Sequence, residues 1–262
     1  MPIACVLRLQ IEHLLEGKIP SALTPVSRTV CEVASTGIDE VDGLLGGGLP
    51  VGTIGEITGP ASSGRTTLAL SFLARCTAEN RVCAWVDAGD ALDPESAAAS
   101  GVTLGRLLWV RCHDTASRTQ KEDKQQLRLE KKPWTKLDQA LRVTDLLLQS
   151  AGFAAIVLDL GDTAQEHGNR IPLATWFRFR QAADRTRCCL VVLGQAAYAQ
   201  SASTLVLECS PQQAETAGET VMRGFIYAVQ RRRQRFASSP ITRRPPASTW
   251  SVGTAWEAEK YE

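Results

Sequence analysis

The sequence predicts an α/β protein with a mainly parallel sheet sandwiched by helices. Three observations lead to this fold class. From residue 35 onward, short apolar runs alternate with segments of helical periodicity. Residues 82–87 and 154–160 are apolar almost throughout, as expected of strands covered on both faces. A glycine-rich loop at residues 59–67 stands between a short strand-like run and a helix, which is typical of a phosphate-binding loop.

Length and composition allow one α/β domain with appended segments. The chain has 262 residues, of which 44% are hydrophobic, and a net charge of +1. It contains no run of about 18 apolar residues, so no membrane span is predicted. Residues 1–15 carry Arg8, Glu12 and His13 among apolar residues, which indicates an amphipathic helix rather than a signal peptide.

The eight cysteines form no C-x-x-C pair, and most of them lie inside apolar runs. Free cysteine often behaves as a small buried hydrophobe. We therefore predict reduced, structural thiols in a cytoplasmic protein, with neither disulfides nor a cysteine-bound metal.

The chain is predicted to have three parts. Residues 1–34 form an N-terminal helix and a linker, and residues 35–236 form the core. Within this core, residues 114–136 are rich in charge and predict a mobile, solvated insertion. Residues 237–262 are rich in Ser, Pro and Thr and predict a disordered tail.

The elements of the core follow from periodicity and from their flanking residues. Predicted strands cover residues 53–58, 82–87, 107–112, 154–160 and 188–193. The strand at residues 107–112 is predicted to be buried. Predicted helices cover residues 66–79, 94–100, 173–186 and the segment marked by Leu137, Leu141, Leu147 and Leu148. Residues 205–209 and 224–229 predict a closing strand pair, and a basic run leads out of the second strand.

The phosphate-binding loop contains one unusual residue. Gly59, Gly64 and Thr66 are in register for such a loop, but Arg65 stands where a lysine reaches the β- and γ-phosphates. A helix N-terminus attracts anions whatever residue follows it. Candidate residues for weak ATP binding are Gly59, Ser62, Ser63, Gly64, Arg65, Thr66, Thr67, Asp159 and Gln195. Thr66 and Asp159 are candidate Mg²⁺ ligands only if nucleotide is bound.

Several motifs together resemble those of bacterial RecA-type recombinases. They are Thr-Gly-Ile-Asp at 36–39, Gly-Gly-Gly-Leu-Pro at 46–50, the Walker A-like residues 56–67, the Val-Asp-Ala strand end at 86–88, Asp159 as a Walker B aspartate and Gln195 as a γ-phosphate sensor. The resemblance covers roughly residues 35–210. It implies a RecA-like P-loop NTPase core with ATP and Mg²⁺ as cofactors.

The departures from this family concern the phosphate chemistry. Gly89 stands where the family has a glutamate that activates water, so no general base can come from that position. Neighbouring Asp90 is a possible substitute. Leu160 follows Asp159 where the family favours a small hydroxyl residue. Together with Arg65, these changes predict weak or absent ATP binding and argue against hydrolysis.

A second set of departures concerns DNA. Residues 160–171 and 196–204 are too short to resemble the family's long DNA-binding loops, so filament-based strand exchange is not expected. The basic run Arg231, Arg232, Arg233 and Arg235 could contact DNA phosphates, an acidic protein partner or neither.

Within the family, the chain is most similar to ImuA-like factors of translesion synthesis. The similarity lies in residues 14–18, in the turn at 46–50, in the altered P-loop and in residues 171–183. It implies a nucleoid-associated, non-catalytic adaptor in the DNA-damage response. The implied partners are a Y-family-like polymerase-related protein and an error-prone replicative-type polymerase, with RecA and DNA as further candidates. The alternatives are an active RecA-type DNA-dependent ATPase and a regulator of RecA filaments.

Overall fold

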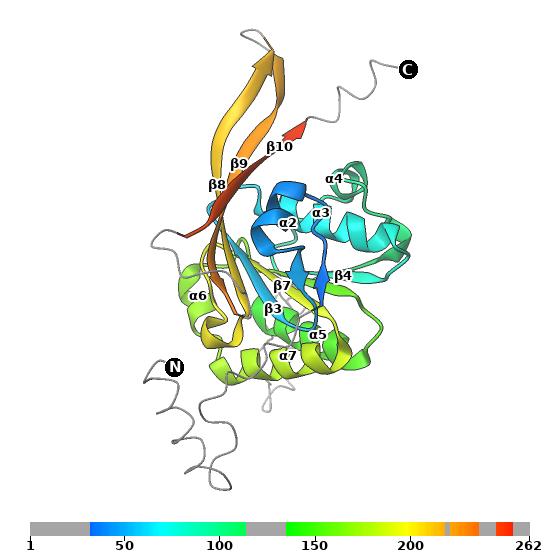
Figure 1. The fold of residues 1–262 in the computed structure, drawn as a ribbon. Helices are drawn as coiled ribbons and strands as arrows, with labels where there is room; N and C mark the ends of the chain where they lie inside the picture. Colours follow the sequence, from blue (N-terminus) through cyan, green and yellow to red (C-terminus); the bar gives the residue numbers. More distant parts are fainter. Residues whose placement is uncertain (1–31, 114–134, 218–220, 236–244, 254–262) are drawn as a thin grey trace, which may run out of the picture. The chain divides into compact units, whose positions relative to one another are not determined.

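A computed structural model describes residues 32–113, 135–217, 221–235 and 245–253 (Figure 1). The predicted N-terminal helix and nearly all of the predicted insertion lie outside these ranges. The main sheet contains β3 (Ile54–Thr58), β4 (Cys83–Asp87), β5 (Leu107–Arg111), β6 (Ala155–Asp159), β7 (Cys189–Gly194), β8 (Leu205–Ala217), β9 (Val221–Gln234) and β10 (Ala247–Gly253). A small antiparallel pair, β1 (Val33–Ala34) and β2 (Leu49–Pro50), precedes it.

The main sheet has the strand order β10-β9-β8-β3-β7-β6-β4-β5. All pairs from β8 to β5 are parallel, whereas β8, β9 and β10 pair in antiparallel fashion. Every residue of β3, β4 and β6 is buried, which explains why β4 and β6 are apolar almost throughout. The predicted α/β class and mainly parallel sheet are therefore confirmed.

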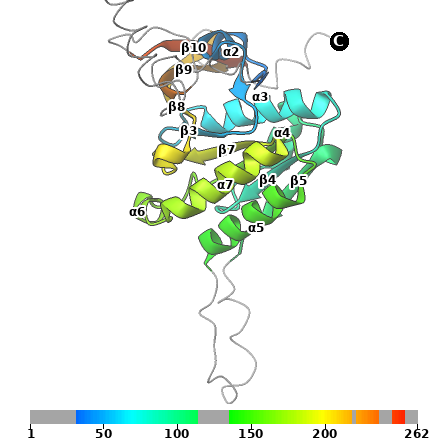
Figure 2. The ribbon, with the colours of Figure 1, turned by 60° about the horizontal axis from the view of Figure 1, so that its bottom comes forward.

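Helices cover both faces of this sheet (Figure 2). One layer contains α2 (Asp39–Leu45), α3 (Arg65–Ala78) and α4 (Pro94–Ala99), and the other contains α5 (Lys136–Ser150) and α7 (Leu173–Thr186). The short α6 (Gln165–Asn169) and the 3-10 turns η1 (Leu104–Arg106) and η3 (Gln200–Ala202) complete the described elements. Phe72 of α3 and Trp176 of α7 are among the large side chains that these two layers bury completely.

Local signals in the sequence set the helix starts. Thr135 and Asp138 form a reciprocal capping box at the start of α5. The Asp93 side chain accepts hydrogen bonds from the backbone N–H groups of Glu95 and Ser96 at the start of α4, where Pro94 occupies the first turn. Both helices therefore begin where an oxygen-bearing side chain satisfies N–H groups that have no helical partner.

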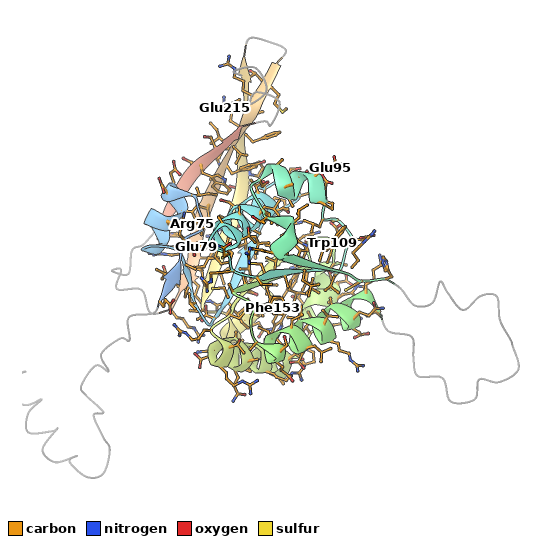
Figure 3. The ribbon with its side chains drawn as sticks, turned by 90° about the vertical axis from the view of Figure 1, so that its right-hand side faces the viewer. Arg75, Glu79, Glu95, Trp109, Phe153 and Glu215 are labelled. Carbon is orange, nitrogen blue, oxygen red and sulfur yellow. The ribbon has the colours of Figure 1, made fainter. Side chains whose placement is uncertain are left out.

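The structure corrects three predictions. Strand β5 was predicted to be buried, but it is the edge strand of the sheet and its residues are half-buried or exposed. The closing strand pair is a much longer hairpin, β8–β9, whose distal part carries Glu215 and projects beyond the helices (Figure 3). Residues 247–253 of the predicted disordered tail form β10, because Trp250 packs into the core beside Tyr227.

A buried carboxylate holds the segment between β7 and β8. Glu56 of β3 is 1% exposed, and its Oε1 accepts hydrogen bonds from the N–H groups of Tyr198 (2.9 Å) and Ala199 (2.5 Å). Burial raises the pKa of Glu56, whereas the charge of Arg233 on β9 lowers it. Arg233 also donates a hydrogen bond to Ser203 Oγ (2.9 Å). The short segment after Gln195 is thus tied to the strand that leads into the P-loop.

The cysteines of the described residues lie in the interior. The six that the structure describes are free and buried: Cys76, Cys83, Cys112, Cys188, Cys189 and Cys209. Burial raises the pKa of the Cys112 thiol to about 11 and that of Cys209 to about 12, so both are protonated at neutral pH. None of the helices in the described ranges is long and apolar enough to cross a membrane.

Candidate nucleotide site

The candidate site lies at the carboxyl ends of the central strands, where parallel sheets bind ligands. Thr58, Gly194, Asp159 and Asp87 occupy neighbouring register positions at the ends of β3, β7, β6 and β4. The loop from Gly59 then leads into α3, which begins at Arg65. The P-loop residues, Asp159 and Gln195 therefore come together as predicted.

Glycines allow the tight path of this loop. Gly64, the residue before α3, has a φ of 84°, a left-handed value that favours glycine. A Cβ on Gly59 would lie 2.4 Å from the carbonyl oxygen of Cys209. Within the described part of the chain, the hydroxyl of buried Ser63 has no hydrogen-bond partner. The loop therefore keeps polar groups that an anion could satisfy.

Arg65 does not extend freely from the loop. Its Nη1 donates hydrogen bonds to the carbonyl oxygens of Gly59 and Gly194 (3.2 Å for Gly194), and its Nη2 donates to that of Gly161 (3.2 Å). Gly59 follows β3, Gly161 lies in the loop after β6, and Gly194 is the last residue of β7. The planar guanidinium thus joins three strand ends through two separate nitrogens, whereas an ammonium has all its donors on one nitrogen.

Asp159 is a buried carboxylate, 9% exposed, whose Oδ1 accepts a hydrogen bond from the Gly161 N–H (2.8 Å). Burial raises its pKa to about 6, and the charges of Asp87 and Asp162 act in the same direction, while the Gly161 bond and Arg65 oppose them. No hydrogen bond reaches Oδ2 from the described residues. This oxygen and the Thr66 hydroxyl fit the preference of Mg²⁺ for oxygen ligands, so both remain candidates when nucleotide binds.

Asp159→Asn is expected to stabilise the protein near pH 7 by on the order of 2 kcal/mol. Because the folded-state pKa is raised, the folded state holds its proton between about pH 4 and pH 6 while the unfolded state has lost it. The stability of the parent therefore falls across this window and levels off above it, whereas asparagine has no proton to lose. Urea unfolding at several pH values measures the difference, and equal pH profiles would contradict the expectation.

Gln195 contacts the loop that follows Asp159. Its Nε2 donates a hydrogen bond to the Gly161 carbonyl (3.1 Å), which also accepts from Arg65. The predicted γ-phosphate sensor and the arginine therefore share one backbone acceptor. Gly161 lies close to both groups, since a Cβ there would be 2.7 Å from Arg65 Nη2.

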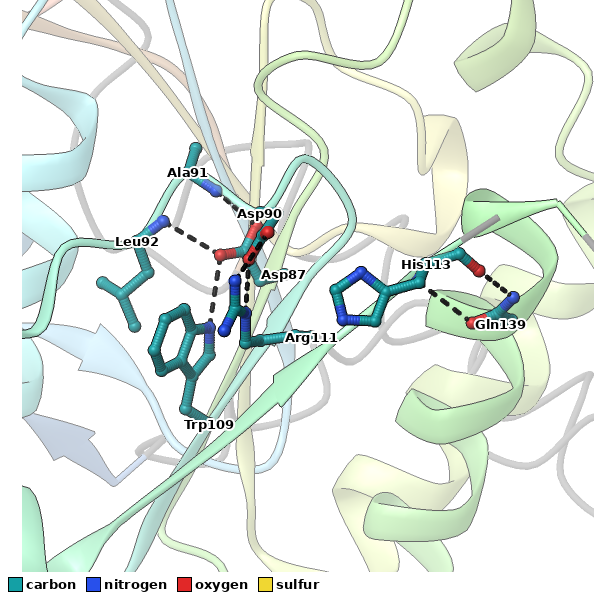
Figure 4. Close-up of polar contacts among 8 residues, drawn as sticks. All are labelled: Asp87, Asp90, Ala91, Leu92, Trp109, Arg111, His113 and Gln139. Carbon is teal, nitrogen blue, oxygen red and sulfur yellow. Dashed lines mark hydrogen bonds and ion pairs between the residues drawn. The ribbon is translucent and has the colours of Figure 1, made fainter. Parts of the chain in front are cut away.

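Asp90 was a possible substitute for the missing glutamate, but its carboxylate has another role. It forms a bidentate ion pair with Arg111 of β5 (2.6 and 2.8 Å), and Arg111 also lies over the Trp109 ring (Figure 4). Asp87 beside it accepts from the Ala91 and Leu92 N–H groups and from Trp109 Nε1. Both carboxylates fix the loop after β4.

Asp162 is a residue that the sequence analysis missed. A Cβ on Gly89 would lie 2.8 Å from Asp162 Oδ2, so this carboxylate fills the space that a side chain on Gly89 would need. Gly89 itself supplies no general base, as its lack of a side chain requires, and the nearby carboxylate belongs to Asp162. Gly89 and Asp162 are far apart in sequence, and a polar residue in the loop after Asp159 was the only sequence signal.

Tyr227 was missed as well. A Cβ on Gly64 would lie 2.6 Å from the Tyr227 ring, and the Tyr227 hydroxyl interacts with the Thr67 side chain. Phe225 and Trp250 continue this aromatic row, with ring centroids 6.0 and 5.3 Å from Tyr227. The long hairpin thus packs directly against the P-loop, although it is distant in sequence.

The basic run differs from its prediction. Arg231, Arg232 and Arg233 lie inside β9 rather than after it, and a bulge at Arg232 turns Arg231 and Arg233 to opposite sides of the sheet. Arg231 donates to the Leu44 carbonyl (2.9 Å), Arg232 forms an ion pair with Glu208, and Arg233 is bound to Ser203. The run is therefore no continuous basic surface.

Sequence comparison shows where this chain is similar to known proteins. Residues 16–127 match the model of the RecA N-terminal domain. Protein RecA of Crocosphaera subtropica is 39% identical over 137 residues, which are 52% of this chain and 33% of that protein. Protein RecA of Nostoc sp. is 38% identical over 150 residues, covering 57% and 36%. The chain thus spans only about a third of the length of the curated relatives it matches.

Structural comparison agrees on the fold. The crystal structure of the RadB recombinase covers 83% of this chain and 94% of its own, with a TM-score of 0.56 and 18% sequence identity. At this identity the similarity shows the fold alone. Residues 16–127 are thus similar to the RecA N-terminal domain, and the chain has the fold of the RadB recombinase.

Proposed function

We propose that this chain is a RecA-like accessory protein that supports error-prone translesion DNA synthesis through protein contacts, without ATP turnover at recombinase rates. The observation that carries the proposal is the position of Arg65. In a working P-loop, a lysine binds the β- and γ-phosphates. Here the corresponding cation is bound to three backbone carbonyls, so it must leave them before it can bind phosphate.

Two further contacts support weak nucleotide binding. Gln195 donates to the Gly161 carbonyl, and Thr67 interacts with Tyr227. Nucleotide binding would compete with both contacts, which costs free energy. We therefore expect weak binding of ATP with Mg²⁺ at most.

ATP hydrolysis tests the catalytic half of the proposal. Purified protein with Mg²⁺, ATP and single-stranded DNA is expected to release phosphate far more slowly than a RecA recombinase. Rapid release that Asp159→Ala abolishes would show an active ATPase and refute the proposal. Calorimetry with and without Mg²⁺ measures the nucleotide affinity itself.

Partner binding tests the other half. The ImuA-like features of the sequence favour a Y-family-like polymerase-related protein and an error-prone replicative-type polymerase as partners. Co-purification tests each of these two partners, with an unrelated replication protein as the negative control. We expect this chain to retain at least one of the two partners. Because Arg231, Arg232 and Arg233 have protein partners, DNA binding is expected to be weak and strongly salt-dependent.

A regulator of RecA filaments is the second candidate. About 40% identity to RecA over roughly half of the chain favours it, because a similar surface could join or cap a filament. A change in RecA filament length on mixing, without any polymerase present, would support this candidate over the adaptor.

A further inference from the structure

We infer that Asp162 can serve as the water-activating carboxylate at this site, and that Arg65 opposes this role. The inference goes beyond the proposed function, because it names the acidic group and the cation that would decide turnover. It rests on where Asp162 lies, on what its neighbours already bind and on the position of the Arg65 guanidinium.

The first observation is the contact between Asp162 and Gly89. A Cβ on Gly89 would come within 2.8 Å of Asp162 Oδ2 and 3.2 Å of its Cβ. These distances are shorter than ordinary van der Waals contacts, so a side chain at position 89 would push the Asp162 carboxylate away from its present place. The end of β4 and the loop after β6 therefore fit together around one acidic group.

The second observation is that this loop faces the phosphate end of the P-loop. The Gly161 carbonyl, one residue before Asp162, accepts hydrogen bonds from both Arg65 and Gln195. Asp162 thus lies beside the groups that would surround a terminal phosphate.

The third observation is that the other carboxylates are engaged. Asp87 accepts three hydrogen bonds, Asp90 is paired with Arg111, and Asp159 accepts from Gly161. Within the described ranges, no hydrogen bond reaches the Asp162 side chain. It is therefore the acidic group at these strand ends that is free to accept a proton.

The step itself balances with water and ATP as the reactants. Asp162 would accept a proton from water as the water oxygen bonds to the terminal phosphorus, and the bond to the ADP oxygen would break. The products are ADP and phosphate, and the proton passes from Asp162 to solvent. Arg65 opposes this step because its guanidinium is bound to the carbonyls that surround the site.

Phosphate release by single and double variants of the full chain tests the inference. Arg65→Lys is expected to raise Mg²⁺-dependent ATP hydrolysis roughly tenfold or more over the parent, because an ammonium carries its donors on one nitrogen and does not span the positions that Nη1 and Nη2 reach. Adding Asp162→Asn is expected to remove this gain and return the rate to that of the parent. Adding Gly89→Ala should also lower it, because the new methyl group displaces the carboxylate.

Asp90→Asn in the Arg65→Lys background is the matched control, since Asp90 faces Arg111. It should lower the rate far less than Asp162→Asn does, and circular dichroism checks that each variant is folded. The inference is overturned if folded Arg65→Lys protein stays inactive, or if Asp162→Asn and Asp90→Asn have equal effects. Rapid hydrolysis by the parent would refute the proposed function instead, and Asp162→Asn in the parent would then test Asp162 separately.

Discussion

Glu56→Ala is expected to lower the free energy of unfolding by about 3–5 kcal/mol. The substitution removes the acceptor of the Tyr198 and Ala199 N–H groups. It also leaves the charge of Arg233 without its buried counterpart, and Arg233 Nε already has no partner among the described residues. Chemical denaturation followed by circular dichroism measures the loss.

Two variants separate this effect from a general loss of a carboxylate. Glu56→Gln keeps an acceptor oxygen and should cost less than Glu56→Ala, because burial raises the Glu56 pKa and already favours an uncharged side chain. Glu79→Ala removes an ion pair with Arg75 whose side chains are 46% and 55% exposed, and such pairs contribute about 1 kcal/mol or less. Similar losses for all three variants would contradict the role assigned to Glu56.

Arg65→Ala is expected to lower the free energy of unfolding by about 3 kcal/mol. The guanidinium bonds three carbonyls that follow three different strands, and alanine leaves all of these oxygens without their charged donor. Hydrogen bonds to charged groups are stronger than neutral ones, although water can reach part of this site and reduces the loss. In an ordinary P-loop, the same cation would contribute mainly to ligand binding.

Arg75→Ala is the control on the same helix. Among the described residues, Arg75 forms its ion pair with exposed Glu79, four residues further along at the end of α3 (Figure 3), so its removal should cost well under 1 kcal/mol. Nucleotide-free protein must be used for both variants, because bound ligand would stabilise the folded state. Equal losses for Arg65→Ala and Arg75→Ala would show that the three carbonyl contacts do not stabilise the fold.

Much of the core was predictable because its signals are local. The run at 82–87 and the helix at 173–186 appear as β4 and α7 with ends within one residue of the prediction. Parallel strands bring their carboxyl ends together, so the meeting of the P-loop with Asp159 and Gln195 also followed. The edge position of β5 did not follow, because an apolar strand pattern does not reveal how many neighbours the strand has.

The extended hairpin and β10 were missed for a related reason. Residues 210–217 of β8 are mostly polar and lack the apolar pattern of a buried strand, yet they pair with β9. Trp250 makes a strand of the Ser/Thr-rich tail by packing against Tyr227, a contact between residues that are distant in sequence. Composition alone therefore predicted disorder where long-range packing forms a strand.

The sequence by itself determined the α/β class, the P-loop and the replacement of its lysine by Arg65, since these depend on residue types at short spacings. Only the tertiary structure decided what Arg65 binds, that Asp162 fills the space beside Gly89 and that the arginines of β9 are held by protein groups. Each of these contacts joins segments separated by many residues. Side-chain partners of this kind depend on strand order and on bulges, which no local pattern encodes.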